Sequence, residues 1–228
     1  MIVIKNSALR GFIRRFVPWV LIPGALVAGA LLPDDKQYWL AALVIAVLSV
    51  VLFISGFEKK KTGSRRLVTV SVMSALAVVG RFIPFFKPVS ALVILTGAYF
   101  GPEAGFLCGS SAALVSNFFF GQGPWTPFQM AAWGMIGLLS GYMSRPLLKS
   151  RALLILWGAL AGAMFSMIMD VWTVLWYARG LRADLYLEAL WTSLTHLILY
   201  SVSNVGFLIL LARPIGEKLS RLKTKYRV

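Results

Sequence analysis

Eight apolar stretches fill almost the whole chain, and each is long enough or nearly long enough to cross a lipid bilayer. A membrane-spanning helix needs about 20 mostly apolar residues. The candidate spans lie at residues 16–32, 38–57, 67–84, 88–101, 104–120, 127–144, 152–177 and 190–212. Few residues remain for a water-exposed domain, so the sequence predicts an all-α integral membrane protein.

Composition and charge agree with a position in lipid. The chain is 59% hydrophobic, whereas ordinary globular domains are about 45–50% apolar. The net charge is +15, but the Lys and Arg residues lie at span ends and in short loops. We therefore expect anionic lipid headgroups, and not nucleic acid, as their partner. Cys108 is the single cysteine, which excludes an intrachain disulfide and a cysteine-based metal site.

Positive charge is distributed unequally between the two sides of the membrane. If the N-terminus is cytoplasmic, most of the 23 Lys and Arg residues fall in inside gaps or in the terminal segments. The outside gaps hold Lys36, Arg81, Lys87, Arg179 and Arg182. Because cytoplasmic loops carry the excess of basic residues, the sequence predicts a multi-pass protein of the cell membrane with both termini in the cytoplasm.

A polar segment containing three consecutive lysines divides the chain. Before it, we expect a helical hairpin that turns at residues 33–35. A cleaved signal peptide is the alternative for the first span, but Pro18 and Pro23 interrupt its apolar run and the second span follows at once. The expected organisation is a peripheral two-helix transmembrane prefix at 1–57, a basic cytoplasmic linker at 58–66, a six-helix bundle at 67–213 and a basic cytoplasmic tail at 214–228.

Small residues recur at helical spacing within the bundle. Gly101, Gly105 and Gly109 follow one another every fourth position, and Gly158 and Gly162 begin a second stripe. Such faces allow two helix backbones to approach closely in a membrane. We expect most of them to pack inside the bundle, and the alternative is that one of them docks a partner subunit.

Polar side chains gather near the outer ends of the predicted spans. Asp170 and His196 lie at similar depths in two spans of opposite direction. His196 belongs to a stripe in which Thr192, Tyr200 and Asn204 also occupy every fourth position, and therefore one helix face. Because polar groups are costly in lipid, we expect these residues to face a cavity that opens to the outside.

The segment from Phe118 to Met130 connects two spans and contains two glycines and two prolines. Its backbone must be irregular, which a membrane protein tolerates where the segment lines a cavity. Tryptophans in this region form either an interfacial belt or apolar walls around a bulky ligand. The predicted substrate-binding residues are Arg81, Asn117, Gln122, Trp125, Thr126, Gln129, Trp133, Asp170, Trp172, His196, Tyr200 and Asn204.

The motifs of common enzymes are missing from the sequence. The chain has no G-x-x-x-x-G-K-[ST] phosphate-binding loop, no H-E-x-x-H and no G-x-S-x-G. With one His and one Cys, it has too few groups for the common zinc and nucleophile sites. We therefore expect no catalytic site, no metal and no cofactor. Asp170 and His196 form either a proton relay, as such groups do in pumps, or a hydrogen-bonded structural pair.

Several stretches resemble the substrate-binding (S) components of energy-coupling factor (ECF) vitamin transporters, and the similarity covers nearly the whole chain. The loop sequence and the two-helix prefix are similar to those of the subgroup associated with cobalamin uptake. The stretches that carry the resemblance are residues 76–81, 100–106, 118–130, 169–173 and 223–226.

The resemblance implies a six-helix bundle that captures a vitamin outside, most directly cobalamin or a related corrinoid. It also implies two kinds of partner, a transmembrane coupling protein and two cytoplasmic ATPases, with Ser71 and Ala75 on the docking face. Three alternatives stay open at this point. They are another flat vitamin with polar edges, such as riboflavin; a self-sufficient proton-coupled permease that uses Asp170 and His196; and a structural membrane subunit without a ligand.

Overall fold

The computed structural model describes Ile4, residues 6–31, 38–56, 60–84 and 86–178, Gly180 and residues 182–226. The regular elements in these ranges are all helices, which confirms the predicted all-α fold. They are α1 (Ser7–Phe16), a π-helical turn (Val17–Leu21), α2 (Ile22–Leu31), α3 (Tyr38–Ser55), α4 (Lys60–Gly80), α5 (Val89–Phe100), α6 (Pro102–Phe120), α7 (Thr126–Tyr142), α8 (Ser144–Lys149), α9 (Arg151–Ala178), α10 (Ala183–Thr192) and α11 (Leu194–Tyr226). The expected hairpin turn at residues 33–35 lies outside the described residues, as do Lys36, Lys59, Arg179 and Arg227.

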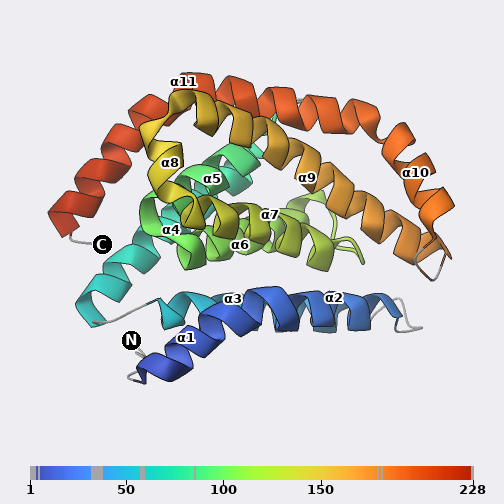
Figure 1. Cartoon of the computed structure of the whole chain (residues 1–228), viewed down its shortest axis with the longest axis horizontal. Helices are drawn as coiled ribbons and strands as arrows, with labels where there is room; N and C mark the ends of the chain where they lie inside the picture. Colours follow the sequence, from blue (N-terminus) through green and yellow to red (C-terminus); the bar gives the residue numbers. More distant parts are fainter. Residues whose placement is uncertain are drawn as a thin grey trace.

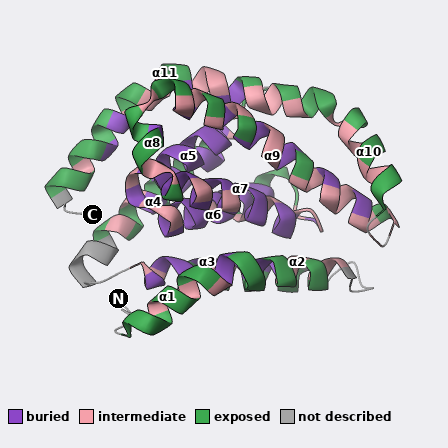
Figure 2. Ribbon diagram, viewed as in Figure 1, coloured by how far each residue is buried: buried purple, intermediate pink, exposed green. Residues whose placement is uncertain are grey.

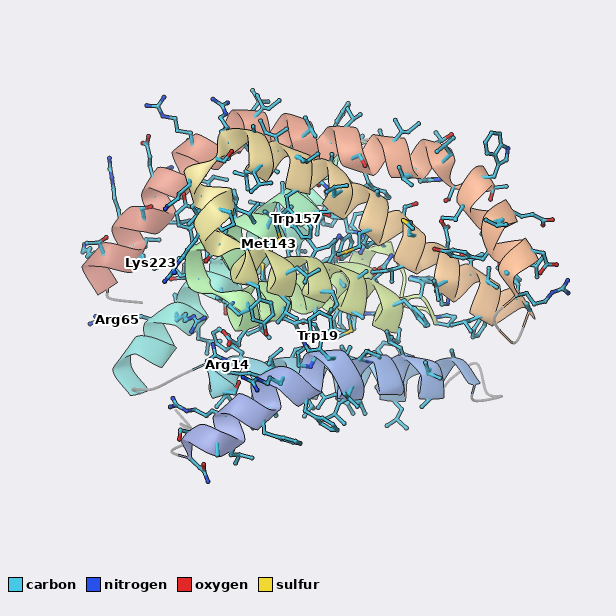
Figure 3. All side chains as sticks on the ribbon, viewed as in Figure 1. Arg14, Trp19, Arg65, Met143, Trp157 and Lys223 are labelled. Atoms are coloured by element: carbon cyan, nitrogen blue, oxygen red, sulfur yellow. The ribbon has the colours of Figure 1, made fainter. Side chains whose placement is uncertain are left out.

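The helices are arranged in three layers (Figure 1). α1 to α3 run along one side of a central group formed by α4 to α7, and α9 to α11 cover the opposite side. Both ends of the chain lie at the same end of the molecule. Arg65 on α4 and Lys223 on α11 also lie there (Figure 3). Basic residues from distant parts of the sequence therefore gather at one end of the fold.

Helix length differs widely among the predicted spans. Three described stretches are long and apolar enough by themselves to cross a membrane, namely Ser7–Ala30, Arg151–Ala178 and Leu194–Lys225. By contrast, α5 has 12 residues, about 18 Å at a rise of 1.5 Å per residue, which is less than a hydrocarbon core of about 30 Å. The expected span at 88–101 is therefore a short central helix. Its residues are almost all buried by their neighbours (Figure 2).

The first long helix passes two prolines without breaking. Pro18 and Pro23 lack the N–H that an α-helix uses for hydrogen bonding, and their rings crowd the preceding turn. The chain accommodates them by widening into the π-helical turn Val17–Leu21 between α1 and α2. Asn6 caps the start of α1, because its side-chain oxygen accepts hydrogen bonds from the backbone N–H groups of Ala8 and Leu9.

Glycines allow the closest helix contacts of the core. A Cβ atom on Gly105 of α6 would overlap the backbone of Gly137 of α7, and a Cβ on Gly137 would overlap Gly105. A Cβ on Gly109 would likewise overlap the backbone of Trp133. Only residues without a side chain permit this approach. The interpretation of this stripe as internal packing is confirmed, and its use as a docking face for a partner is wrong.

Two helix boundaries differ from the prediction. Residues 60–66, expected in a linker, form the first turns of α4, because no proline in this segment stops the helix. The expected last span is divided, since α10 ends at Thr192, Ser193 lies in a turn, and α11 continues through the expected tail to Tyr226. Thr192 therefore leaves the predicted polar stripe, and its hydroxyl donates to backbone carbonyl groups of α10 instead.

A buried carboxylate joins the prefix to the bundle. Glu103, in the first turn of α6, is only 3% exposed and pairs with Arg14 of α1 and Arg66 of α4. Arg66 also donates to the carbonyl oxygens of Gly56 and Phe100. Arg14 lies on α1 near the end that carries both termini (Figure 3). Loss of one partner from a buried ion pair lowers the stability of a protein. The pair with Glu103 therefore makes α1 a stabilising neighbour of the bundle.

Candidate functional site

A cavity of about 550 Å³ opens between the α4–α5 loop, the end of α6 and the first turns of α11. Three of the predicted site residues line it, Arg81, His196 and Tyr200, together with Lys87 and Phe120. Pockets for small molecules usually have about 300–1,000 Å³, so this cavity is large enough for one. The first turns of α11 lie away from the end that carries both termini (Figure 1).

Arg81 is held at the cavity wall by a buried polar network. Its Nη1 donates to Ser116 Oγ at 2.5 Å and to Asn117 Oδ1 at 2.6 Å. Asn117 is fully buried, and its Nδ2 donates to Thr126 Oγ1 at 2.9 Å and to Gln129 Oε1 at 3.0 Å. The oxygen and the nitrogen of the Asn117 amide are both hydrogen-bonded to other side chains of the protein. Asn117 therefore holds Arg81 in position.

The loop after α6 supplies the rest of the network. Thr126 Oγ1 donates to Gln122 Oε1 at 2.9 Å, and Gln122 Nε2 donates to the carbonyl oxygen of Leu114 at 2.9 Å. Gly121, with φ of +97°, ends α6 in a conformation that favours glycine. These bonds fasten the loop to α6 and α7. The structure thus brings Arg81 together with four predicted polar residues around this loop, and most of their hydrogen bonds are internal to the protein.

An aromatic wall extends from this network toward α11. The guanidinium carbon of Arg81 lies 5.3 Å from the centre of the Trp133 ring. Trp133 donates from Nε1 to Ser90 Oγ at 3.2 Å and stacks on Phe165, with 4.6 Å between ring centres. Phe165 in turn contacts Tyr200 edge to face, at 5.1 Å. Trp133 therefore lies behind the cavity wall. Of these three aromatic rings, Tyr200 is the one that lines the cavity.

Trp125 and Trp172 contact each other, away from the cavity that contains Arg81. Their ring centres are 5.9 Å apart in an edge-to-face arrangement. A gap of about 20 Å³ separates Trp172 from Leu26 and Ala41 of the prefix, which is space for no more than a water molecule. The Trp172 Nε1 is buried without a hydrogen-bond partner. Trp172 therefore faces the prefix in this structure, and Trp125 packs against Trp172.

Asp170 bonds to the turn before α11. Its carboxylate accepts a hydrogen bond from Ser193 Oγ at 2.6 Å, and the residue is 6% exposed. His196 is close enough to act on Asp170 electrostatically, but no hydrogen bond joins the two among the described residues. The bond to Ser193 fixes the second half of α9 against the α10–α11 turn.

Asn204 has a packing role between α9 and α11. Its Nδ2 donates to the carbonyl oxygen of Gly158 at 3.1 Å, and it is 1% exposed. A Cβ on Gly162 would overlap the backbone of Ser201, so the two helices approach closely along this stretch. The polar stripe of α11 therefore divides into His196 and Tyr200, which face the cavity, and Asn204, which faces α9.

The sequence analysis missed Lys87 as a site residue. Lys87 lines the cavity, and its backbone carbonyl oxygen accepts a hydrogen bond from Ser203 of α11 at 3.3 Å. A signal was present, because Lys87 and Arg81 are two basic residues in one short gap on the side where the positive-inside rule expects few. In the part of the chain that the structure describes, no group of three His, Cys, Asp or Glu side chains could hold a metal ion.

Comparison with known proteins identifies the family. The family model for ECF transporter, substrate-specific component, matches residues 65–215. The match begins in α4 and ends in α11, so it covers every element around the cavity. No curated protein and no solved structure matches the chain. The chain belongs to the family of substrate-specific components of ECF transporters, and it is a membrane transport subunit and not an enzyme.

Proposed function

We propose that this protein captures a vitamin outside the cell, in the cavity lined by Arg81, His196 and Tyr200, for import by an ATP-driven ECF module. The observation that carries the proposal is the cavity, whose cationic wall is fixed by a buried network in a chain of this family. A side chain that is ordered before the ligand arrives loses less conformational freedom on binding. The arrangement therefore suits capture from dilute solution.

The proposed substrate is cobalamin or a related corrinoid. The similarity of the loop at 118–130 and of the prefix to the cobalamin subgroup supports this choice. A corrinoid is larger than the cavity of about 550 Å³, so part of it would extend beyond the opening. A smaller flat vitamin with polar edges, such as riboflavin, would fit within the cavity and is the second candidate. Mass spectrometry of ligand that co-purifies from a native-like host distinguishes the two.

The proposed partners are a transmembrane coupling protein and two cytoplasmic ATPases. Ser71 and Ala75 lie on an exposed face of α4, and Val72 and Leu76 on the same helix are about half exposed. Small side chains one turn apart permit close approach of another membrane helix. This face is the proposed docking surface, and both termini are proposed to lie in the cytoplasm with the ATPases.

Uptake measurements test the transport mode. We expect vitamin uptake into cells to require co-expression of the coupling protein and ATPases, and to persist when the proton gradient is dissipated while ATP is maintained. A proton-coupled permease would show the opposite dependence. The Asp170 carboxylate accepts from Ser193, which supports a structural role for Asp170 over a relay through His196.

Substitution of Tyr200 is expected to weaken vitamin binding. Tyr200 supplies the aromatic surface of the cavity, and removal of a buried aromatic contact costs about 1.5–3 kcal/mol, or roughly 10- to 100-fold in affinity. Tyr200→Ala should show this loss by isothermal titration calorimetry with cobalamin and riboflavin. Trp125→Ala and Asp170→Ala serve as comparisons. If these two lose affinity while Tyr200→Ala does not, the substrate occupies the side of Trp125 and Trp172 and the proposed cavity is wrong.

Deletion of residues 1–57 is expected to preserve ligand binding and to lower thermal stability. No described residue of the prefix lines the cavity, but Arg14 forms an ion pair with Glu103. The deletion should therefore reduce the unfolding temperature in detergent while leaving the dissociation constant unchanged. Glu103→Gln in the truncated chain should lower the unfolding temperature further, because Arg66 would lose its ion pair with Glu103. A monodisperse truncated chain that no longer binds ligand would show that the prefix helps to form the site.

A further inference from the structure

Two cations share the candidate cavity. The guanidinium carbon of Arg81 lies 4.9 Å from the centre of the Phe120 ring, and the Lys87 ammonium lies 5.8 Å from the same centre. Both residues line the cavity. Each is also fixed by α-helical neighbours, Arg81 through Ser116 and Lys87 through the bond from Ser203 to its backbone. The two positive charges therefore lie near the same aromatic ring at the wall of one cavity.

Neither cation has a carboxylate partner among the described residues, unlike the basic side chains of Arg182 and Arg66. Arg182, between α9 and α10, pairs with Asp184 at 2.5 Å. Arg66 pairs with Glu103 at 3.5 Å. At the cavity, by contrast, the neighbouring charge that acts on Lys87 is Arg81, which repels it.

The proximity of the two cations affects the pKa of Lys87. Burial, and to a smaller extent the Arg81 guanidinium, lower the pKa of the Lys87 ammonium below its ordinary value. Both effects disfavour the charged form. An anion bound between the two side chains would reverse the repulsion and form charge-assisted hydrogen bonds, which are among the stronger ones in proteins. The cavity therefore carries positive charge, which an anionic ligand would balance.

We propose that Arg81 and Lys87 bind an anionic group of the transported substrate, a carboxylate or a phosphate ester, while Phe120 and Tyr200 contact its apolar part. The inference rests on the proposed function and narrows the substrate to vitamins that carry an acid. In a corrinoid, the matching group is the phosphodiester of the nucleotide loop. A lipid phosphate has the same chemistry, so the experiment must separate lipid from substrate.

The first experiment uses inorganic phosphate, so that it does not depend on which vitamin is bound. The full-length protein is placed in nanodiscs of phosphatidylcholine, which has no net charge, and its unfolding temperature is measured with millimolar phosphate against sodium chloride of equal ionic strength. Phosphate should raise the unfolding temperature of the wild type and of Lys87→Arg, and should have little effect on Lys87→Gln. Arg182→Gln is the matched control, because it removes a cation outside the cavity, and it should respond like the wild type. An equal response of the wild type and Lys87→Gln would overturn the inference.

The second experiment compares ligands that differ by the acidic group. The pairs are cobalamin with cobinamide, which lacks the nucleotide loop and with it the phosphodiester, and pantothenate with its alcohol panthenol. For the pair that binds, the acidic member should bind about tenfold more tightly or better, and Lys87→Gln should abolish most of this preference. Equal affinities within that pair would overturn the inference while leaving vitamin capture intact. If no vitamin binds and uptake does not depend on the ATPases, the proposed function fails, and the phosphate measurement still decides the anion site.

A lipid source is tested by native mass spectrometry. The wild type and Lys87→Gln are released from nanodiscs that contain phosphatidylglycerol. Retention of this lipid by the wild type alone, with competition against the acidic vitamin, would assign the two cations to a lipid headgroup and overturn the assignment to substrate. Equal lipid retention by both proteins supports the assignment to substrate.

Discussion

Gly137→Leu is expected to prevent assembly of the bundle. Even the first carbon of a side chain at this position would overlap the backbone of Gly105 on α6, and no choice of rotamer relieves a clash with main chain. The helices would have to separate at the centre of the core, so we expect a loss of more than about 3 kcal/mol of stability. The measurement is the monodisperse fraction on size-exclusion chromatography in detergent, together with the unfolding temperature.

The matched control for this prediction is Gly206→Leu. Gly206 is also a helical glycine, on α11, but a Cβ built there meets no atom within 4 Å. The same substitution should therefore leave assembly unchanged, or improve it, because leucine is a better helix former than glycine. A well-assembled Gly137→Leu protein would mean that α6 and α7 can pack at a greater distance than in this structure.

Ala75→Trp is expected to abolish vitamin uptake by the complete transporter while the purified subunit still binds ligand. Ala75 is exposed on α4, so a larger side chain can project outward from the fold, where it would hold a partner helix several ångströms away. The cavity is formed by other residues and should keep its affinity. Uptake is measured in cells that express the whole transporter, and binding is measured by calorimetry on the isolated protein.

Ala152→Trp on α9 is the control for this docking prediction. Ala152 is likewise exposed, but it lies on a helix of another layer (Figure 1), so transport should continue. Transport by Ala75→Trp at the wild-type rate would show that this face of α4 contacts lipid. The stripe of Gly105 and Gly109 is no substitute for it, because α7 already covers these glycines.

The sequence predicted the helices well because apolar length is a local property. The effect of the prolines was harder to predict. The chain accommodates Pro18 and Pro23 with a π-helical turn, so the helix continues past both. The division of the last span at Ser193 was also missed. Nothing in its composition distinguishes a helix end there from a continuing helix, because the turn depends on the bond between Ser193 and Asp170 of another helix.

For the candidate site, the sequence indicated which polar residues lie inside the protein. It indicated less well which neighbours these residues contact. Asn117 bonds to Thr126 and Gln129, and these residues are close in sequence, but their bonds to one another were not predicted. Trp172 and Asn204 are on the correct helices, but they face the prefix and α9 instead of the cavity. Helical spacing tells which residues share a face, whereas the neighbour that this face meets depends on how the helices cross.

The contact between Arg14 and Glu103 constrains how the protein can move in the membrane. If the proposed transport cycle tilts the bundle in the membrane, the end of α6 that holds Glu103 would move toward hydrocarbon. Glu103 would enter that environment together with Arg14 and Arg66, already neutralised by its partners. A bare carboxylate at the same depth would be far more costly. The pair between Arg14 and Glu103 would then draw the prefix along with the bundle, so the moving unit would include α1 to α3 as well as the helices around the cavity.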